Sequence, residues 1–269
     1  MAGVLFFEKN IADLDNDSAS ITVTDLVATN SGQDYVNYLR DRTNATGWAT
    51  TDSDDSALTK IEVDLGDTFP VTDVFLLRNN FKDFHLEYWD GAAYQDLTPI
   101  ASQTANTEAD LRISFDEIET SKFRLTINKT FVVDDDKFLS QFIVTRLIGQ
   151  FSRVIEIAEL KIARNRRTIK TLSGKAKIQR GVGAVSCVLR DNNVTESDDH
   201  EIVEYLTDSI DGFLVWLCGG DTTQFSQQRI GYRRQDLYLM NMVNEYAPTY
   251  EKGFFKHGIP INLQLVEVI

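Results

Sequence analysis

The chain has 269 residues, of which 42% are hydrophobic and 25% charged, proportions that are ordinary for a soluble globular protein of two domains. Its net charge of −14 lies in the first part, because residues 1–150 hold 26 acids and 12 bases whereas residues 151–269 hold 15 of each. An acidic first part argues against nucleic acid as a partner, since phosphates would be repelled. No segment approaches the roughly 18 consecutive apolar residues that a membrane span requires.

The shift in charge predicts a domain boundary near Gly149, which gives domains at residues 1–149 and 150–269. The N-terminus has no basic region before a short apolar run, Val4–Phe7, which argues against a secretory signal. We therefore expect synthesis in a reducing compartment, where Cys187 and Cys218 would be buried thiols.

The first domain is predicted to be all-β, because apolar or alternating runs are separated by turn residues and no helical periodicity is visible. The clearest strand is Lys60–Leu65, in which apolar residues alternate with charged ones before Gly66. Residues 28–58 are rich in Asn, Asp, Thr and Ser and are predicted to be loop. The other predicted strands are 4–7, 21–26, 74–77, 84–89, 93–97, 110–115, 122–127 and 141–149.

One series of residues has the order and spacing of a known family: Trp48, Val63–Gly66, Val74, Leu76, Phe84, Leu86, Tyr88–Trp89 and Lys122–Ile127. Over residues 30–149 the chain resembles the discoidin-type (coagulation factor C-type) branch of galactose-binding-like modules. The resemblance implies a jelly-roll β-sandwich that binds glycans, lipids or proteins through loops at one end. It also implies that such a module often carries a structural calcium ion.

The resemblance directs attention to acids in the loop before the first long strand. Asp41 is the best-placed calcium ligand, and Asp52 and Asp54 are weaker ones. Hard cations need several converging oxygens, and a loop rich in aspartate is otherwise a solvated surface. The loop is therefore either a structural calcium site, as the resemblance implies, or a solvated acidic surface.

Aromatic residues define the remaining expectations for this domain. Trp48 and Trp89 are expected to be core or near-core residues, and Trp48 has a second interpretation as a platform on which a sugar stacks. The segment from Phe131 to Asp134 is either a ligand-facing loop with an exposed aromatic or a tucked edge beside a solvated acidic turn. The predicted ligand-binding residues are accordingly Trp48, Phe131 and Asp134.

The second domain is predicted to be an antiparallel β-sandwich crossed by one helix, so that the whole chain is mainly β with an α+β second part. The helix has Ser197 as its N-cap, acids in its first turn and a stop at Asp211–Gly212. Its apolar stripe contains Ile202, Val203, Tyr205, Leu206 and Ile210. Strand-like runs cover 153–162, 181–190, 213–218, 236–243 and 259–269, with a basic hairpin at 164–180 and a polar loop at 221–235.

The charges of this domain are separated. Residues 164–180 carry seven bases and no acid, whereas residues 196–211 around the helix hold seven acids. Such patches allow copies to meet head to tail and close into a ring, although a basic hairpin is also typical of a solvated face. The residues expected at an assembly interface are Arg164, Arg166, Arg167, Lys170, Arg229, Arg233 and Arg234.

Two stretches of the second domain, 213–217 and 231–240, are similar to the β-sandwich building blocks of phage tails, such as distal-tail and tube proteins. This resemblance implies a ring-shaped homo-oligomer whose partners are other tail or baseplate proteins. It also implies a place in the virion tail after synthesis in the host cytoplasm. A glycan is the further ligand that the first domain would take.

Catalysis has little support in the sequence. The three histidines are far apart along the chain, and the common hydrolase, zinc-protease and phosphate-loop motifs are absent. We therefore predict a non-enzymatic structural subunit of a phage tail tip or baseplate that carries a carbohydrate-binding-like module. The alternative is a free-standing, lectin-like glycan-binding protein with a discoidin-like module.

Overall fold

The protein is described from a computed structural model in which contacts divide the chain into two units. The sandwich unit is built on residues 8–147, and the mixed unit combines residues 1–7 with residues 148–222 and 226–269. The structure describes residues 4–25, 33–42, 46–51, 54–97, 102–152, 156–162, 166–170, 176–180, 185–194, 197–217, 237–244 and 259–267.

The sandwich unit is all strand apart from one short helix, η1, which is a 3-10 helix at Gln33–Arg40. This helix falls in the segment predicted to be loop, where Val36 and Leu39 supply buried apolar anchors. The strands are β2 (Ser20–Asp25), β3 (Trp48–Ala49), β4 (Thr59–Leu77), β5 (Phe81–Trp89), β6 (Tyr94–Asp96), β7 (Ser102–Gln103), β8 (Leu111–Thr130), β9 (Phe138–Leu139) and β10 (Gln141–Thr145).

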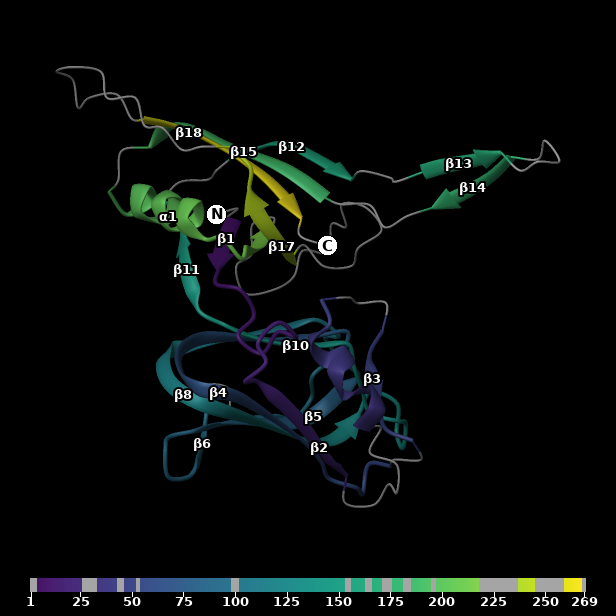
Figure 1. Ribbon diagram of the computed structural model, residues 1–269. Helices are drawn as coiled ribbons and strands as arrows, with labels where there is room; N and C mark the ends of the chain where they lie inside the picture. The colour runs from purple at the N-terminus through teal and green to yellow at the C-terminus, as the bar shows by residue number, and fades with distance from the viewer. Residues whose placement is uncertain are drawn as a thin grey trace. The chain divides into compact units, whose positions relative to one another are not determined.

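The frame of the sandwich unit is a long antiparallel ribbon of β4 and β8, which curve together in Figure 1. The predicted strands 60–65 and 74–77 are two halves of the single strand β4. Gly66 lies between them with a φ of 83°, and a Cβ there would lie 2.6 Å from the Ser18 carbonyl oxygen. Only glycine fits this position without strain, and it permits the ribbon to bend instead of ending the strand.

The bent ribbon forms both layers of the sandwich. Strand β2 pairs with the first half of β4 and β10 pairs with the second half, while β5 pairs with the second half of β8. Both halves of β4 contribute to one apolar core, with Ile61 and Val63 from the first half and Val74 and Leu76 from the second. The result is the mainly-β sandwich that the alternating runs predict.

The ribbon gives the unit two distinct ends. The bend end contains Gly66 and the chain crossings to the mixed unit, because the Glu8 amide donates to Arg146 O and the Leu147 amide to Thr72 Oγ1. The loop end contains residues 54–58, 78–80, 106–110 and 131–137, which flank the opposite ends of the same strands. Pairing of Thr59 with Ile127 and of Phe81 with Thr130 brings these segments together.

Strand β5 places Trp89 on the outer face of the sheet, whereas the sequence predicts a core or near-core position. Phe84 and Leu86 are buried, so the outer face of the strand carries the odd-numbered residues that follow them. Trp89 is half-buried on that face, where its ring packs edge-on against Tyr94 at 5.2 Å between centroids. Because alternate residues of a strand point to the same face, Trp89 lies on the face that carries His85 and Glu87.

The mixed unit contains a seven-stranded sheet in the order β11-β1-β16-β17-β18-β15-β12. Its elements are β1 (Val4–Phe7), β11 (Leu147–Gln150), β12 (Glu156–Ile162), β13 (Arg166–Lys170), β14 (Ala176–Arg180), β15 (Val185–Val194), α1 (Ser197–Asp208), β16 (Phe213–Leu217), β17 (Leu237–Met242) and β18 (Ile259–Glu267).

Strand β1 corrects the expected first domain, which included it. Val4 pairs with Leu217 and Phe7 with Leu214, so β1 lies inside the sheet of the mixed unit. All four of its residues are buried, and such a strand needs a central position, since an edge or a half-solvated sheet would expose one face. The predicted strand 141–149 is likewise divided, because β11 belongs to this sheet.

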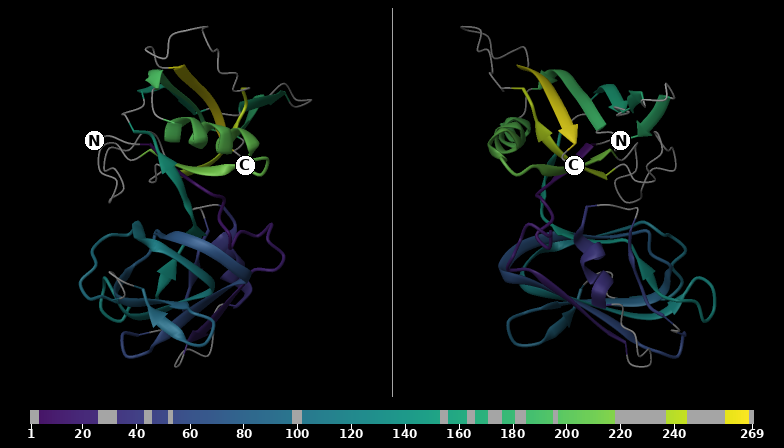
Figure 2. Two further views of the ribbon diagram at one scale, coloured as in Figure 1. Left: turned by 90° about the vertical axis from the view of Figure 1, so that its left-hand side faces the viewer. Right: turned by 45° about the vertical axis from the view of Figure 1, so that its right-hand side comes forward.

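Helix α1 is confirmed close to its predicted bounds and lies beside the sheet in Figure 2. Ile202, Val203 and Leu206 are buried in the core of the mixed unit, whereas Tyr205 and Ile210 are exposed. Gly212, with a φ of 88°, ends the segment as expected. Neither η1 nor α1, the helices of the described residues, is long and apolar enough to span a membrane.

The predicted basic hairpin is a separate two-stranded ribbon. Arg166 of β13 pairs with Arg180 of β14, and neither strand joins the seven-stranded sheet. Figure 1 shows the ribbon extending beyond β12. Its backbone therefore has the form of an arm, and of the predicted interface residues Arg166, Arg167 and Lys170 belong to β13, while Arg164, Arg229, Arg233 and Arg234 fall outside the described residues.

Candidate recognition site at the loop end

Most of the residues predicted for ligand or calcium binding lie at or beside the loop end of the sandwich unit. The Asp55 amide donates to Asp134 Oδ1, which joins the segment 54–58 to the segment 131–137. Trp48 pairs with Leu139 immediately after the second segment. Asp41 is held beside the start of β10, since Gln141 Nε2 donates to its Oδ1 at 2.7 Å. Asp52 lies outside the described residues.

Trp48 does not provide a sugar platform, because its side chain is fully buried in the core of the sandwich unit. Strand β3, which carries it, is only two residues long and pairs only with β9 in the described part of the chain. The indole therefore holds this short strand by apolar burial more than by backbone hydrogen bonds. Its first interpretation, as a core residue, is the one that the structure supports.

The carboxylates of Asp41 and Asp54 are occupied by hydrogen bonds within the protein. Thr46 Oγ1 and Gln141 Nε2 donate to Asp41. The hydroxyl and amide of Ser56 donate to Asp54, and these bonds lower the pKa of its carboxyl. Neither aspartate belongs to a cluster of three His, Cys, Asp or Glu side chains with metal-ligand spacing among the described residues. A calcium ion at this loop stays a prediction.

A buried ammonium group organises this part of the loop end. Lys137 is fully buried, and its Nζ donates to the carbonyl oxygens of Asp54 and Ala57, both at 2.9 Å. Carbonyl oxygens that converge on one point require a cation or a strong donor. Lys137 supplies that cation from the chain itself, and it fixes the segment 54–57 against the segment that follows β8.

Three asparagines fix the adjoining turns. Asn79 Nδ2 donates to Ala109 O at 2.8 Å and Asn106 Nδ2 to Phe81 O at 2.7 Å. Asn80 donates to Asp136 O and accepts from the Phe138 amide. Asn79 and Asn106 are buried, so these bonds are shielded from water and hold the loops in one conformation.

The segment between β8 and β9 projects from this rigid base as an apolar tip, defined as Phe131, Val132 and Val133. Their relative exposures are 36%, 65% and 72%, so the segment is an exposed loop and not a tucked edge. The Phe131 amide donates to Asn80 O, and Asp134 turns the chain with a φ of 59°. Asp134 and Asp135 are exposed beside the apolar side chains.

This arrangement offers several kinds of contact to a ligand. It offers an aromatic ring, two valines and carboxylate acceptors on a backbone that is already ordered, which lowers the entropic cost of holding a ligand. The acids also give the tip a negative field that disfavours anionic ligands. Sequence reasoning identified Phe131 and Asp134 but missed Lys137, whose position directly after three aspartates reads as a solvated acidic turn.

Comparisons with known proteins were made for family, sequence and structure. No family model matches the chain, and no curated protein matches it. Among solved structures, it is similar to a GH29 fucosidase from Ruminococcus gnavus in complex with fucose (TM-score 0.41, 19% identity), covering 51% of this chain and 26% of the fucosidase. It thus spans about a quarter of that enzyme.

Two smaller modules are also similar to this chain. One is chitosan-binding module 1 from a chitosanase/glucanase of Paenibacillus sp. IK-5, with a TM-score of 0.40 and 17% identity, covering 50% of this chain and 97% of the module. The other is the family 32 carbohydrate-binding module of NanJ from Clostridium perfringens in complex with galactose. Its TM-score is 0.41 and its identity 16%, over 51% of this chain and 98% of the module.

Proposed function

We propose that this protein is a non-enzymatic recognition protein whose sandwich unit binds a neutral or amino-bearing saccharide at the loop end. The observation that carries the proposal is the apolar tip, which stands on a base fixed by Lys137 and three asparagines. Exposed apolar side chains on an ordered loop are typical of a binding surface, because a ligand would bury them at a low entropic cost.

The chemistry of the tip favours a saccharide. A pyranose presents C–H groups to an aromatic face and hydroxyl groups to acceptors, and Phe131 and Asp134 offer these two kinds of contact within one turn. The run Asp134–Asp136 repels sulfated, phosphorylated and carboxylated sugars, and it attracts the ammonium of an amino sugar. The tip lies at the opposite end of the unit from the two chain crossings, so the connections do not cover it.

Replacing Phe131 by alanine is expected to weaken saccharide binding about tenfold or more, since a central aromatic contact dominates the energy of a small interface. Binding would be measured on a glycan array with neutral, amino and anionic sugars, followed by calorimetry with the best ligand. Tyr35→Ala is the matched control, because Tyr35 is also an exposed aromatic of this unit at 53%. Unchanged binding in Phe131→Ala, or preference for anionic sugars or for lipid vesicles, contradicts the proposal.

The mixed unit favours a second, compatible role in assembly, of the kind served by subunits of a phage tail tip or baseplate. The β13–β14 ribbon has unpaired outer edges among the described residues, and its two strands contain five of the seven bases of the hairpin. Such an arm would reach a neighbouring copy through backbone pairing and through charge, and α1 carries the exposed acids Asp198, Glu201 and Glu204, which would receive it.

The double reversal Arg166→Glu with Arg167→Glu is expected to shift the protein from a ring-sized species toward monomer in light scattering at low salt. High salt is expected to weaken the wild-type assembly in the same direction, because partly exposed charges are screened. The matched control is Lys9→Glu with Lys82→Glu, a change of equal charge in the sandwich unit. A wild-type protein that is monomeric at every concentration contradicts the assembly role.

A further inference from the structure

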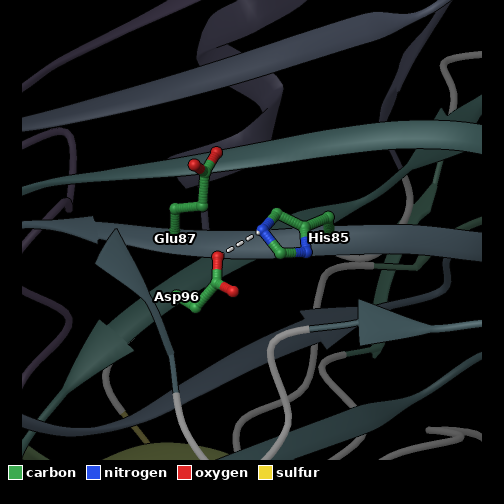
Figure 3. A group of neighbouring side chains, drawn as sticks. All are labelled: His85, Glu87 and Asp96. Atoms are coloured by element: carbon green, nitrogen blue, oxygen red, sulfur yellow. Dashed lines mark hydrogen bonds and ion pairs between the residues drawn. The ribbon is translucent and has the colours of Figure 1, made fainter. Parts of the chain in front are cut away.

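A second group of functional side chains lies on the outer face of the sandwich unit, away from the apolar tip. His85 and Glu87 alternate along β5, and Glu87 pairs with Asp96 of β6 across the hairpin. Figure 3 shows His85 and Asp96 turned toward each other, with Glu87 beside them and its carboxylate directed away from that pair. His85 Nε2 is 2.9 Å from Asp96 Oδ1, and one ligand atom from each residue lies within 4.8 Å of the other two.

His85 and Glu87 are each oriented by a hydrogen bond to a neighbouring side chain, Ser102 and Arg124 respectively. Ser102 Oγ lies 2.7 Å from His85 Nδ1. Without a bound ion, His85 Nε2–H donates to the Asp96 carboxylate, since a carboxylate only accepts. An ion that takes Nε2 replaces this proton, and Nδ1–H then donates to the Ser102 hydroxyl, which is the outer-shell partner that a metal-bound histidine needs. Arg124 donates from Nε and Nη2 to the two oxygens of Glu87, both at 2.7 Å, and its guanidinium stacks on Tyr94.

The pair with Arg124 does not prevent Glu87 from binding a metal. A carboxylate has about four lone-pair positions, so one oxygen can accept from the guanidinium and still face an ion. Metal-bound carboxylates are commonly hydrogen-bonded in this way from outside the ligand shell. The guanidinium offsets one of the two negative charges, so the metal-free group keeps a net negative charge that attracts a dication.

We propose that His85, Glu87 and Asp96 bind one divalent transition-metal ion of the Zn²⁺ class, with water as the fourth ligand. An imidazole nitrogen with two carboxylates suits Zn²⁺ and its neighbours, whereas Ca²⁺ takes six to eight oxygens. Zn²⁺ bonds of about 2.0–2.2 Å place ligand atoms roughly 3.4 Å apart, so the side chains need only small rotations. The Asp96 side chain is 67% exposed and is free to make that adjustment.

The consequence of the site is a link between strands that are weakly attached. β6 has three residues and β7 two, and both pair only with β5 among the described strands. An ion held by His85, Glu87 and Asp96 joins β6 to β5, and the hydrogen bond from His85 to Ser102 extends the link to β7. Because an ion that binds only the folded chain stabilises it, Zn²⁺ is expected to raise the unfolding temperature of the sandwich unit.

The test is calorimetric titration of the chelator-treated full-length protein with ZnCl₂, together with thermal unfolding. We expect one site that His85→Gln weakens about tenfold or more, since glutamine keeps hydrogen-bonding groups but lacks the imidazole lone pair. Asp96→Asn is expected to weaken it as well, and Asp116→Asn, a matched change at an exposed carboxylate of the same unit, is expected to leave it unchanged. Lowering the pH should weaken binding, because protons compete for the ligands.

The chain has two other histidines and two cysteines that could also bind zinc, so the test must show that the ion binds at His85. A shift of the His85 ring nitrogens in NMR on adding Zn²⁺, with the rings of His200 and His257 unmoved, identifies the site directly. Zinc binding that survives both His85→Gln and Asp96→Asn overturns the proposal, as does the absence of any zinc-dependent change at His85. Equal binding of CaCl₂ at this site also overturns it, since the donor set would then not select the metal.

Discussion

A chain that begins at Glu8 is expected to lose the fold of its mixed unit while its sandwich unit remains folded. The deletion removes β1 from the interior of the seven-stranded sheet, between β11 and β16. Burial of an apolar side chain is worth roughly 1.5–3 kcal/mol, so the four residues of β1 represent roughly 6–12 kcal/mol. The whole stability of a domain is about 5–15 kcal/mol, which leaves little or nothing for the truncated unit.

Tryptophan fluorescence reports this outcome for each unit separately. The chain has three tryptophans, of which Trp216 lies in β16 of the mixed unit, paired with Leu5. Its emission is expected to be that of an exposed indole in the truncated chain. Phe6→Ala is a milder version, expected to cost about 3–5 kcal/mol because the ring packs against Phe151 and Phe213. An unchanged unfolding midpoint of the mixed unit in both chains would contradict the position of β1.

The fate of β1 also shows which part of the fold the sequence could predict. Alternation identified the first half of β4, and the apolar stripe with its stop signal identified α1, because both patterns depend on residues close in sequence. The partner of β1 is β16, more than two hundred positions along the chain, and no local pattern specifies it. A charge count placed the boundary near residue 149, but charge carries no information about strand pairing.

The candidate sites also contain residues that local sequence patterns can identify and residues that only strand pairing brings together. Phe131 and Asp134 lie in one segment, so the sequence could single them out together, but it left open whether Phe131 is exposed or tucked, and only the structure shows the exposure. His85 and Glu87 share a face by simple alternation, yet Asp96 joins them only through the hairpin register. A two-residue turn at Asp90–Gly91 would place Tyr94 opposite Glu87. The hairpin instead pairs Trp89 with Tyr94, because Asp90 Oδ1 accepts from the amides of Ala92 and Ala93 in a longer loop.

Trp48→Ala is expected to destabilise the sandwich unit by about 3–5 kcal/mol, which is the usual cost of truncating a fully buried indole. The residues around Trp48 can relax little into the cavity that the substitution would leave. Strand β3 has only two residues, and a Cβ on the preceding Gly47 would lie 2.6 Å from the Phe138 ring, so the backbone is already in close contact there. Urea unfolding followed by circular dichroism measures the change in the free energy of unfolding.

Trp89→Ala is the matched comparison, because it removes the same side chain from the opposite side of the sheet. Trp89 is half-buried and packs edge-on against Tyr94, so the expected cost is about 1 kcal/mol. Equal losses in the two variants would mean that β5 presents the other face to the core. Since β3 pairs with β9 directly after the loop that bears Phe131, Trp48→Ala is also expected to loosen the apolar tip and weaken saccharide binding, whereas Trp89→Ala leaves binding unchanged.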